Sequence, residues 1–224
     1  MNKNNILKMK NLIVFDIDGT LTDSVTQHIT AFKETLVEMG VSEINADFKT
    51  FKHHTDSFIS KEIYESNRNE VFSKEKFDLF ENRLTEKLKS QKINEITGAK
   101  ELIDELQNNT EFGFCFATGS LRRAAEYKLN SIGVKFEDWQ LVTSDTIYER
   151  ENIVKTAIEN AAKQYKVSSF DRVISVGDGL WDLITARNLE LEFVGVGLTN
   201  KEILIENGAK IVFENLTEFE LLSL

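Results

Sequence analysis

The sequence of 224 residues contains no proline, a single cysteine and no long apolar run. Without proline, the loops must take their shape from glycine, asparagine, aspartate and serine. The lone Cys115 excludes an internal disulfide framework and is typical of a reducing cytosol, so we expect a cytoplasmic location. No stretch approaches the roughly 20 apolar residues of a membrane span. Met1–Lys10 lacks the apolar region of a signal peptide, so we expect neither secretion nor a membrane partner.

Basic residues are also scarce relative to acidic ones. The chain has 27 Lys and Arg against 37 Asp and Glu, which gives a formal net charge of −10. Sequence-independent binding to nucleic acid needs a basic patch, so this balance argues against a nucleic-acid partner. The hydrophobic and charged shares, 41% and 29%, are those of an ordinary globular protein.

Short apolar runs alternate with amphipathic segments along most of the chain. Segments such as Ala99–Leu106 and Ile153–Tyr165 carry apolar residues at helical spacing. Strands and helices in alternation predict right-handed βα units and an α/β fold, a Rossmann-like parallel sheet flanked by helices. The runs that we expect to form strands are 12–15, 112–117, 139–142, 173–176, 193–196 and 210–213.

The segment from Asp23 to Ile96 interrupts this alternation, because it has helical patterns and no strand-like run. We therefore expect an inserted all-helical unit over 23–95 and an α/β core domain over 1–22 and 96–224, with hinges at 21–24 and 94–98. The apolar stripes that predict these helices, and that we expect in a core, are Val25, Ile29, Phe32, Leu36 and Met39; Phe58, Ile59, Ile63 and Tyr64; and Phe77, Phe80, Leu84 and Leu88.

The most informative segment is the apolar run Leu12–Phe15 followed by Asp-Ile-Asp-Gly-Thr at 16–20. A branched apolar run of this kind is typical of a strand buried on both faces of a parallel sheet. Side chains alternate along a strand, so Asp16 and Asp18 leave it on the same side. Open α/β sheets bind their ligands at the carboxyl ends of strands, where these acids lie. Their repulsion would raise one pKa unless a cation screens them.

A second apolar run, Val173–Val176, leads to another pair of acids, Asp178 and Asp182. Asp182 alone would be typical of the first turn of a helix. Asp178 lies between two glycines, where no comparable structural role accounts for it. Together with Asp16 and Asp18 they form an oxygen-only cluster, the ligand type that a hard cation such as Mg²⁺ requires. We therefore expect these four acids to be the metal ligands.

Two further segments offer groups that suit a phosphate oxygen. One predicted strand ends in Thr118, Gly119 and Ser120, where a hydroxyl and free N–H groups at a helix start can bind an anion. Thr and Ser are also ordinary N-caps, so this signal is weak alone. Arg150 and Lys155 are the candidates for a cation that neutralises a phosphorylated substrate. Arg150 lies nearer the predicted sheet edge, whereas Lys155 lies within the helix.

Taken together, these segments resemble the haloacid dehalogenase superfamily of aspartate-nucleophile phosphotransferases. The family's Asp-x-Asp-Gly-Thr motif matches 16–20, its strand-terminal Thr or Ser matches Thr118, and its Gly-Asp-x-x-x-Asp motif matches 177–182. The family's basic residue is often a Lys followed by Pro; this chain lacks that pair, and Arg150 is matched in its place. The resemblance covers essentially the whole chain, because the helical insertion lies where the family's cap emerges. It is nearest to the phosphoglycolate phosphatase and β-phosphoglucomutase subgroup.

The resemblance implies a Mg²⁺-dependent phosphatase that hydrolyses a small phosphorylated metabolite. Asp16 would attack phosphorus and form an aspartyl-phosphate, while Asp18 would protonate the leaving oxygen and then deprotonate water. Mg²⁺ would be bound by the Asp16 side chain, the Asp18 carbonyl and Asp178, with Asp182 orienting a bound water or Arg150. The other residues expected to act are Thr118 and Arg150 in catalysis and Gly19, Gly119 and Ser120 in substrate binding.

Two alternatives remain open. A sugar phosphomutase of the same superfamily shares all of these motifs. A non-enzymatic phosphoacceptor, like a receiver domain of two-component signalling, also combines acids, a Thr or Ser and a basic residue, but it has no helical insertion of this size. The substrate is not predicted. His53 and His54 lie in an expected loop of the helical unit that could face the site, and His54 is the candidate for substrate contact. We expect a monomer.

Overall fold

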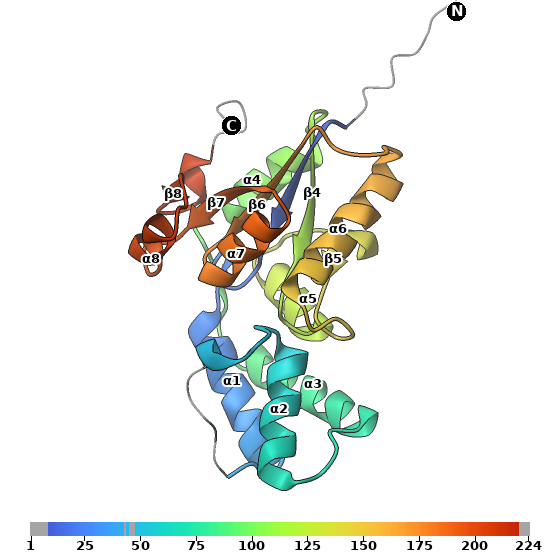
Figure 1. Cartoon of the computed structure of the whole chain (residues 1–224), viewed down its shortest axis with the longest axis vertical. Coiled ribbons are helices and arrows are strands. Elements are labelled where there is room, and N and C mark those ends of the chain that lie inside the picture. The colour runs from blue at the N-terminus through green and yellow to red at the C-terminus, as the bar shows by residue number, and fades with distance from the viewer. Residues whose placement is uncertain (1–8, 43, 45–47, 220–224) are drawn as a thin grey trace, which may run out of the picture.

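The computed structural model describes residues 9–42, 44 and 48–219; most of Met1–Lys10, where we expect no signal peptide, lies outside them. A parallel six-stranded sheet has the order β5-β4-β1-β6-β7-β8 (Figure 1). This confirms the α/β fold that the alternating pattern predicts. The strands are β1 (Asn11–Phe15), β4 (Phe112–Ala117), β5 (Leu141–Val142), β6 (Arg172–Gly177), β7 (Glu192–Val196) and β8 (Val212–Phe213).

Helices cover both faces of the sheet because the strand residues alternate between two apolar clusters. Ile13 and Phe15 belong to one cluster with residues of α4 (Ala99–Gln107) and α5 (Arg122–Ser131). Leu12 and Val14 belong to another cluster with residues of α6 (Arg150–Tyr165). The strand is therefore buried on both sides, as its composition predicts. The remaining helices of this domain are α7 (Leu180–Asn188) and α8 (Lys201–Glu206), with single turns at η2 (Asp138–Gln140) and η3 (Leu216–Glu218).

The predicted strand at 139–142 is shorter than expected. Its first part forms the turn η2, and only Leu141 and Val142 pair with β4. The turn is held by Gln140, which is buried, accepts a hydrogen bond from the Glu137 N–H and donates one to the Phe114 carbonyl at 3.2 Å. Trp139 packs edge-on against Tyr165 of α6. The apolar character of this run therefore serves packing as much as pairing.

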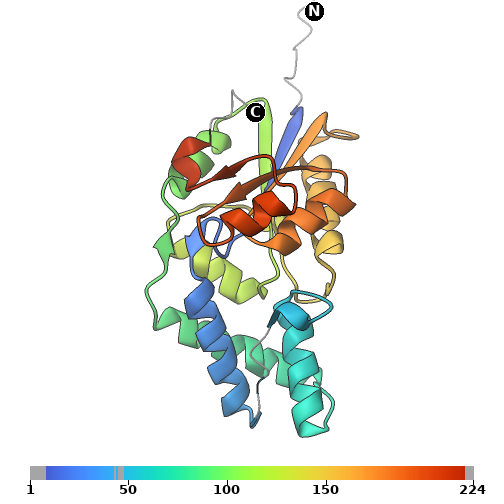
Figure 2. The ribbon, with the colours of Figure 1, turned by 60° about the vertical axis from the view of Figure 1, so that its left-hand side comes forward.

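The inserted unit contains α1 (Val25–Glu38), α2 (Asp56–Arg68) and α3 (Lys74–Lys89), with a single turn at η1 (Phe48–Thr50). These helices lie together at one end of the molecule in both ribbon views (Figures 1 and 2). The unit has its own apolar cluster, which includes Phe32, Leu36, Ile63, Phe80 and Leu84. Among the described residues, no helix combines the length and the apolar character that a membrane crossing needs.

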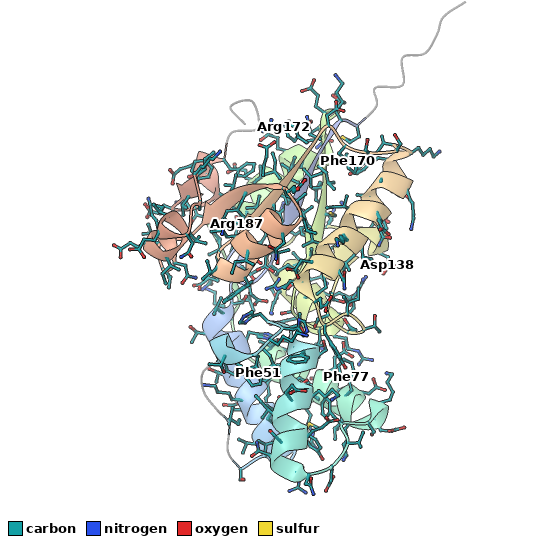
Figure 3. All side chains as sticks on the ribbon, viewed as in Figure 1. Phe51, Phe77, Asp138, Phe170, Arg172 and Arg187 are labelled. Carbon is teal, nitrogen blue, oxygen red and sulfur yellow. The ribbon has the colours of Figure 1, made fainter. Side chains whose placement is uncertain are left out.

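The chain enters and leaves this helical cap through two paired strands. β2 (Thr22–Asp23) and β3 (Asn94–Glu95) are antiparallel, with Thr22 opposite Glu95. These short strands fall within the two segments that we expected to be hinges. Arg172, the first residue of β6, lies at the end of the sheet far from α1–α3 (Figure 3). The carboxyl ends of the strands therefore face the cap.

One part of the predicted cap core is wrong. Val25 and Ile29 are exposed, at 39% and 36%, although they continue the stripe of Phe32 and Leu36. The buried face at the start of α1 instead contains His28, with Ala31 one turn later. A polar histidine takes this position because it meets polar partners at the boundary between cap and core.

Candidate active site

The loop after β1 brings two distant segments together. Asp16 is 5% exposed, and its N–H donates to the Val176 carbonyl of β6 at 2.9 Å. The chain then turns at Gly19, which has φ +79°. A Cβ at this position would lie 2.3 Å from Asp178 Oδ2, so only glycine allows the close approach. Gly19 thus lies against Asp178, and the acids from two strands meet at one sheet edge.

Three acids form the centre of the site. Asp16, Asp178 and Asp182 each offer a carboxylate oxygen, and these oxygens lie within 4.8 Å of one another. Arg150, the first residue of α6, places Nη1 3.0 Å from Asp16 Oδ1 and 3.6 Å from Asp182 Oδ1. Its side chain is 12% exposed. Lys155, the other candidate cation, is exposed further along the same helix. The structure therefore brings Arg150, and not Lys155, to the acids.

The three acids carry more negative charge than Arg150 balances. Burial raises the pKa of Asp16, and Asp18 adds to the rise while Arg150 opposes it. Burial and the charge of Asp16 raise the pKa of Asp182 to about 7. Burial and three neighbouring acids raise the pKa of Asp178 well above its usual value. The acids also raise the pKa of Arg150 against the effect of burial, so it stays charged. A further cation would relieve this repulsion.

The donor set fits a hard divalent cation. All three acids offer oxygen, and Asp178 Oδ1 is buried without a hydrogen-bond partner among the described residues. A buried polar atom of this kind normally has a partner, which a metal ion would supply. Mg²⁺ is typically bound by one or two carboxylates and keeps waters and substrate oxygens as its other ligands, so this cluster offers enough carboxylates to hold it.

The end of β4 lies beside this cluster. Thr118 is buried, and its Oγ1 accepts a hydrogen bond from the Ser120 N–H at 3.1 Å. Gly119 has no room for a side chain, since a Cβ would lie 2.6 Å from the His54 carbonyl oxygen and 3.2 Å from Arg150 Cζ. Arg150, the Gly119 backbone and the His54 loop of the cap therefore converge at one point. This is where we expected the phosphate group.

The cap contributes His54 to the same region. Its ring stacks on Trp181 of α7, with centroids 5.3 Å apart and planes inclined by 26°. Burial, together with the charges of Arg150 and His53, lowers the pKa of His54. Trp181 Nε1 is buried without a hydrogen-bond partner among the described residues. The loop that contains His54, which the sequence indicated only as a candidate for substrate contact, thus lies directly on the core domain beside the acids.

Asp18 belongs to a different environment from the other acids. Its Oδ2 accepts from Ser120 Oγ at 2.7 Å and from Lys128 Nζ at 2.6 Å, while Oδ1 accepts from the Ser24 hydroxyl. Burial opposes ionisation here, but the attraction of Lys128 and these hydrogen bonds lower the pKa of Asp18. The Asp18 carboxylate is therefore not one of the three clustered acids. Its expected contact with a metal is through the backbone carbonyl.

Sequence reasoning missed Lys128 and His28. Lys128 is fully buried on α5, and Nζ lies 2.9 Å from His28 Nδ1. A signal was present, because Lys128 occupies the same helix face as the buried residues Ala124, Ala125 and Leu129. A charged residue on an apolar stripe needs a buried partner, and an acid at the strand end is a natural one.

Comparison with known proteins agrees with the motifs. The family model of haloacid dehalogenase-like hydrolases matches residues 13–196. None of the curated proteins matches this sequence. A solved hydrolase from Pseudomonas syringae is 22% identical, with a TM-score of 0.65 over 93% of this chain and 97% of its own. CbbY from Rhodobacter sphaeroides, solved with phosphate, is 18% identical, with a TM-score of 0.71 over 94% and 96%.

A protein from Bacteroides vulgatus that is provisionally designated a beta-phosphoglucomutase is 15% identical, with a TM-score of 0.69 over 96% of this chain and 87% of its own. At such low identities these likenesses establish the fold alone. The match to the family model covers most of the chain and includes Asp16, Thr118, Arg150 and Asp178. The chain therefore belongs to the haloacid dehalogenase-like hydrolase family.

Proposed function

We propose that this hydrolase is a Mg²⁺-dependent phosphatase that acts on a small phosphorylated metabolite through an aspartyl-phosphate on Asp16. The observation that carries the proposal is the pairing of a buried strand-end carboxylate, Asp16, with Arg150 at 3.0 Å, beside Asp178 and Asp182. With one cysteine and a net charge of −10, we further propose a cytoplasmic monomer without a nucleic-acid partner.

The chemistry follows from the position of each group. Asp16 would attack phosphorus, which breaks the ester bond to the leaving oxygen and splits one difficult transfer into two easier ones. Arg150 would neutralise the phosphoryl oxygens from one side, and the Thr118 hydroxyl and the Gly119 N–H would hydrogen-bond them from the other. His54 and the cap loop would contact the leaving group and exclude bulk water.

Asp18 would serve both half-reactions. It would protonate the leaving oxygen in the first and remove a proton from water in the second, so that the carboxyl regains its proton and Asp16 is freed. The low pKa of Asp18 in this structure favours the ionised form, which is the form that the second half-reaction needs. For the first half-reaction, the incoming phosphate ester would bring negative charge near Asp18 and so raise its pKa.

Asp16, Asp178 and the Asp18 carbonyl would hold Mg²⁺, and Asp182 would orient one of its waters or the Arg150 side chain. When bound, the ion supplies positive charge that lowers the repulsion between the Asp16 carboxylate and the phosphoryl oxygens. Without it, three acids would face a dianionic substrate with the single guanidinium of Arg150.

The test is release of inorganic phosphate from a chromogenic aryl phosphate and from a panel of phosphorylated metabolites. We expect turnover with Mg²⁺ and loss of turnover on chelation with EDTA, restored by added Mg²⁺. CbbY is also solved with xylulose-(1,5)bisphosphate, so pentose bisphosphates belong in the panel. No phosphate release from any compound in the presence of Mg²⁺ would refute the proposal.

A phosphomutase is the second candidate, because the Bacteroides vulgatus relative of the same fold carries that designation. A mutase returns the phosphoryl group to a second hydroxyl of the sugar instead of to water. Isomerisation of a sugar monophosphate that requires a bisphosphate activator, with little release of phosphate, would favour the mutase. Steady phosphate release without an activator would favour the phosphatase.

A further inference from the structure

Lys128 is a buried cation that the proposed reaction does not use. Its side chain is 0% exposed, and Nζ reaches Asp18 Oδ2 at 2.6 Å, Ser120 Oγ at 2.9 Å and His28 Nδ1 at 2.9 Å. An ammonium carries three N–H donors, and these three atoms can accept all of them. Burial of a charge is unfavourable unless it is paired and hydrogen-bonded in this way. The arrangement therefore depends on all three partners being present.

The Lys128 contacts fix the orientation of Asp18. Asp18 Oδ2 is held by Lys128 and Ser120, and Oδ1 by the hydroxyl of Ser24. Ser24 precedes α1 and is fully buried, with Thr22 Oγ1 2.7 Å from its Oγ. A carboxylate bound at both oxygens cannot rotate freely, so its position relative to Asp16 is set by groups outside the acid cluster.

The network crosses from the core to the cap. Lys128 and Ser120 belong to the core, whereas His28 lies on α1 of the cap. His28 Nε2 lies 2.9 Å from Asp56 Oδ1 at the start of α2. Lys128 can donate to Nδ1 when that nitrogen has a free lone pair, and the Nε2–H then donates to Asp56.

Asp56 of the cap also hydrogen-bonds directly to the core. Its N–H donates to the Gly119 carbonyl at 2.8 Å, and its Oδ2 accepts from the Leu121 N–H at 3.2 Å. Two cap helices thus meet the loop that carries Gly119 and Ser120, directly beside Lys128. Separation of cap and core would break the Lys128–His28 contact and both contacts of Asp56 together.

We propose that Lys128 is a positioning residue which holds the Asp18 carboxylate in its working orientation, and that it does so fully only while His28 and Asp56 of the cap are docked on the core. The inference rests on the proposed function, because it assigns Lys128 to the residue that would handle the proton in that reaction. It makes the steps that need Asp18 dependent on a closed cap.

The first experiment compares Lys128→Met with Asp18→Asn on two substrates. Methionine fills similar volume without the charge. Asp18→Asn sets the reference pattern, a larger loss on an alkyl phosphate, whose leaving group must be protonated, than on an aryl phosphate. We expect Lys128→Met to reproduce it, with kcat on the alkyl ester reduced roughly 10²-fold and KM values little changed. The loss on the aryl ester should be smaller, about 10-fold, because deprotonation of water in the second half-reaction is common to both esters. Equal losses on both esters, or no loss, would overturn the proposal.

His28→Phe tests the cap side and serves if Lys128→Met does not fold. Phenylalanine keeps a ring of similar size and removes both nitrogens, so Lys128 and Asp56 each lose one contact. We expect the same preference for the aryl ester at a smaller size, on the order of 10-fold in kcat on the alkyl ester. Thr30→Ala, on the exposed side of α1, is the matched control and should behave as wild type. A His28→Phe enzyme equal to this control would overturn the coupling to the cap.

Trp181 offers a readout that does not depend on activity. Because His54 of the cap stacks on it, docking shields the indole. In a Trp139→Phe background, Lys128→Met and His28→Phe should shift Trp181 emission to longer wavelength, and Thr30→Ala should not. Unchanged emission in both variants would overturn the docking part. If the wild type releases no phosphate at all, the proposed function is wrong, and the fluorescence comparison still tests whether the cap docks through these residues. If the wild type is active but the variants lack the kinetic pattern, only the role of Lys128 is wrong.

Discussion

Asp16 and Asp18 are two residues apart in one loop, yet their environments shift the pKa values of the two carboxyl groups in opposite directions. Asp16 joins two other acids around Arg150, and its pKa is raised. The Asp18 carboxylate accepts hydrogen bonds from Lys128 and from two hydroxyls, and its pKa is lowered. Both carboxylates are largely buried, so burial alone does not explain the difference. The ratio of acids to cations around each one does.

This contrast shows how one motif supplies two kinds of carboxylate. The partners come from far along the chain: Arg150 is 134 residues from Asp16, and Lys128 is 110 residues from Asp18. The acid cluster is short of positive charge and suits a metal ion, whereas the Asp18 network is already balanced. A change to either set of partners should therefore affect a different step.

The largest effect is expected from Asp16→Asn. An amide cannot act as the nucleophile, so kcat should fall by roughly 10³-fold or more on aryl and alkyl phosphates alike. Steady-state phosphate release measures the loss, and circular dichroism should show an intact fold. Asp171→Asn, at an exposed acid, is the matched control. An Asp16→Asn enzyme with even a tenth of wild-type activity would assign the nucleophile elsewhere.

Arg150→Ala should follow, with a loss of roughly 10²-fold in kcat/KM, because the phosphoryl oxygens lose their cation. Lys155→Ala removes an exposed cation from the same helix and should leave kcat/KM unchanged. Arg150→Lys should lie between the two, since an ammonium lacks the planar fork of a guanidinium. Comparable losses in Arg150→Ala and Lys155→Ala would mean that the site responds to overall charge and not to this contact.

The stability of the metal-free protein should depend on pH through the acid cluster. The pKa of Asp182 rises from 3.8 to about 7 on folding, so the native state binds protons more tightly than the unfolded state between these values. The free energy of unfolding should therefore fall as pH increases from about 4 to about 7. Asp18, with a lowered pKa, contributes stability that is lost only in acid, as pH falls below about 4.

Asp182→Asn removes one of these protonation sites, so its melting temperature should fall less than that of wild type between about pH 5 and pH 8. The difference should be on the order of 1 kcal/mol, or about 2–4 °C for a chain of this size. Mg²⁺ should raise the wild-type melting temperature more at the higher pH, because the ligands must be deprotonated. Parallel curves with and without Mg²⁺ at every pH would argue against a metal at these acids.

The smallest effect is expected from His54→Ala, which tests contact between the cap loop and the leaving group. We expect KM for the true substrate to rise by a few-fold, about 1 kcal/mol of binding, with a smaller change for a generic aryl phosphate. His53, the neighbouring residue, packs edge-on against Phe58 of the cap, so His53→Ala is the comparison variant. If neither KM nor kcat changes in His54→Ala, the loop does not contact substrate.

The sheet, the helical insertion and the acid cluster could be predicted from the sequence, because each leaves a pattern in short segments of the chain. An apolar run ending in acids places those acids at a sheet edge, and parallel strands bring 16–20 and 177–182 together. Arg150 could be preferred over Lys155 by its position at a helix start. The two-residue length of β5 could not be foreseen, because it depends on the hydrogen bonds of Gln140 and the packing of Trp139.

The environment of Asp18 was missed for a different reason, although Lys128 lies on an apolar helix face. Lys128 and His28 lie on helices, where single charged or polar residues usually face solvent, and the two residues are 100 positions apart in the sequence. The prediction that Val25 and Ile29 are buried is wrong for the same reason: the buried face at the start of α1 contains His28, at the boundary with the core. Periodicity locates a buried face to within about a third of a turn, which is too coarse to separate these residues.

The pairing of β2 with β3 has a consequence for how the two domains evolve and move. Both crossings of the chain run side by side, with Thr22 opposite Glu95 and Asp23 opposite Asn94. A rotation at one crossing must therefore be shared by the other, so any movement of the helical unit would be a rotation about a single hinge axis. Such a unit is also a cassette: with both cut points adjacent, it can be exchanged for another of different size without disturbing the sheet that carries the chemistry.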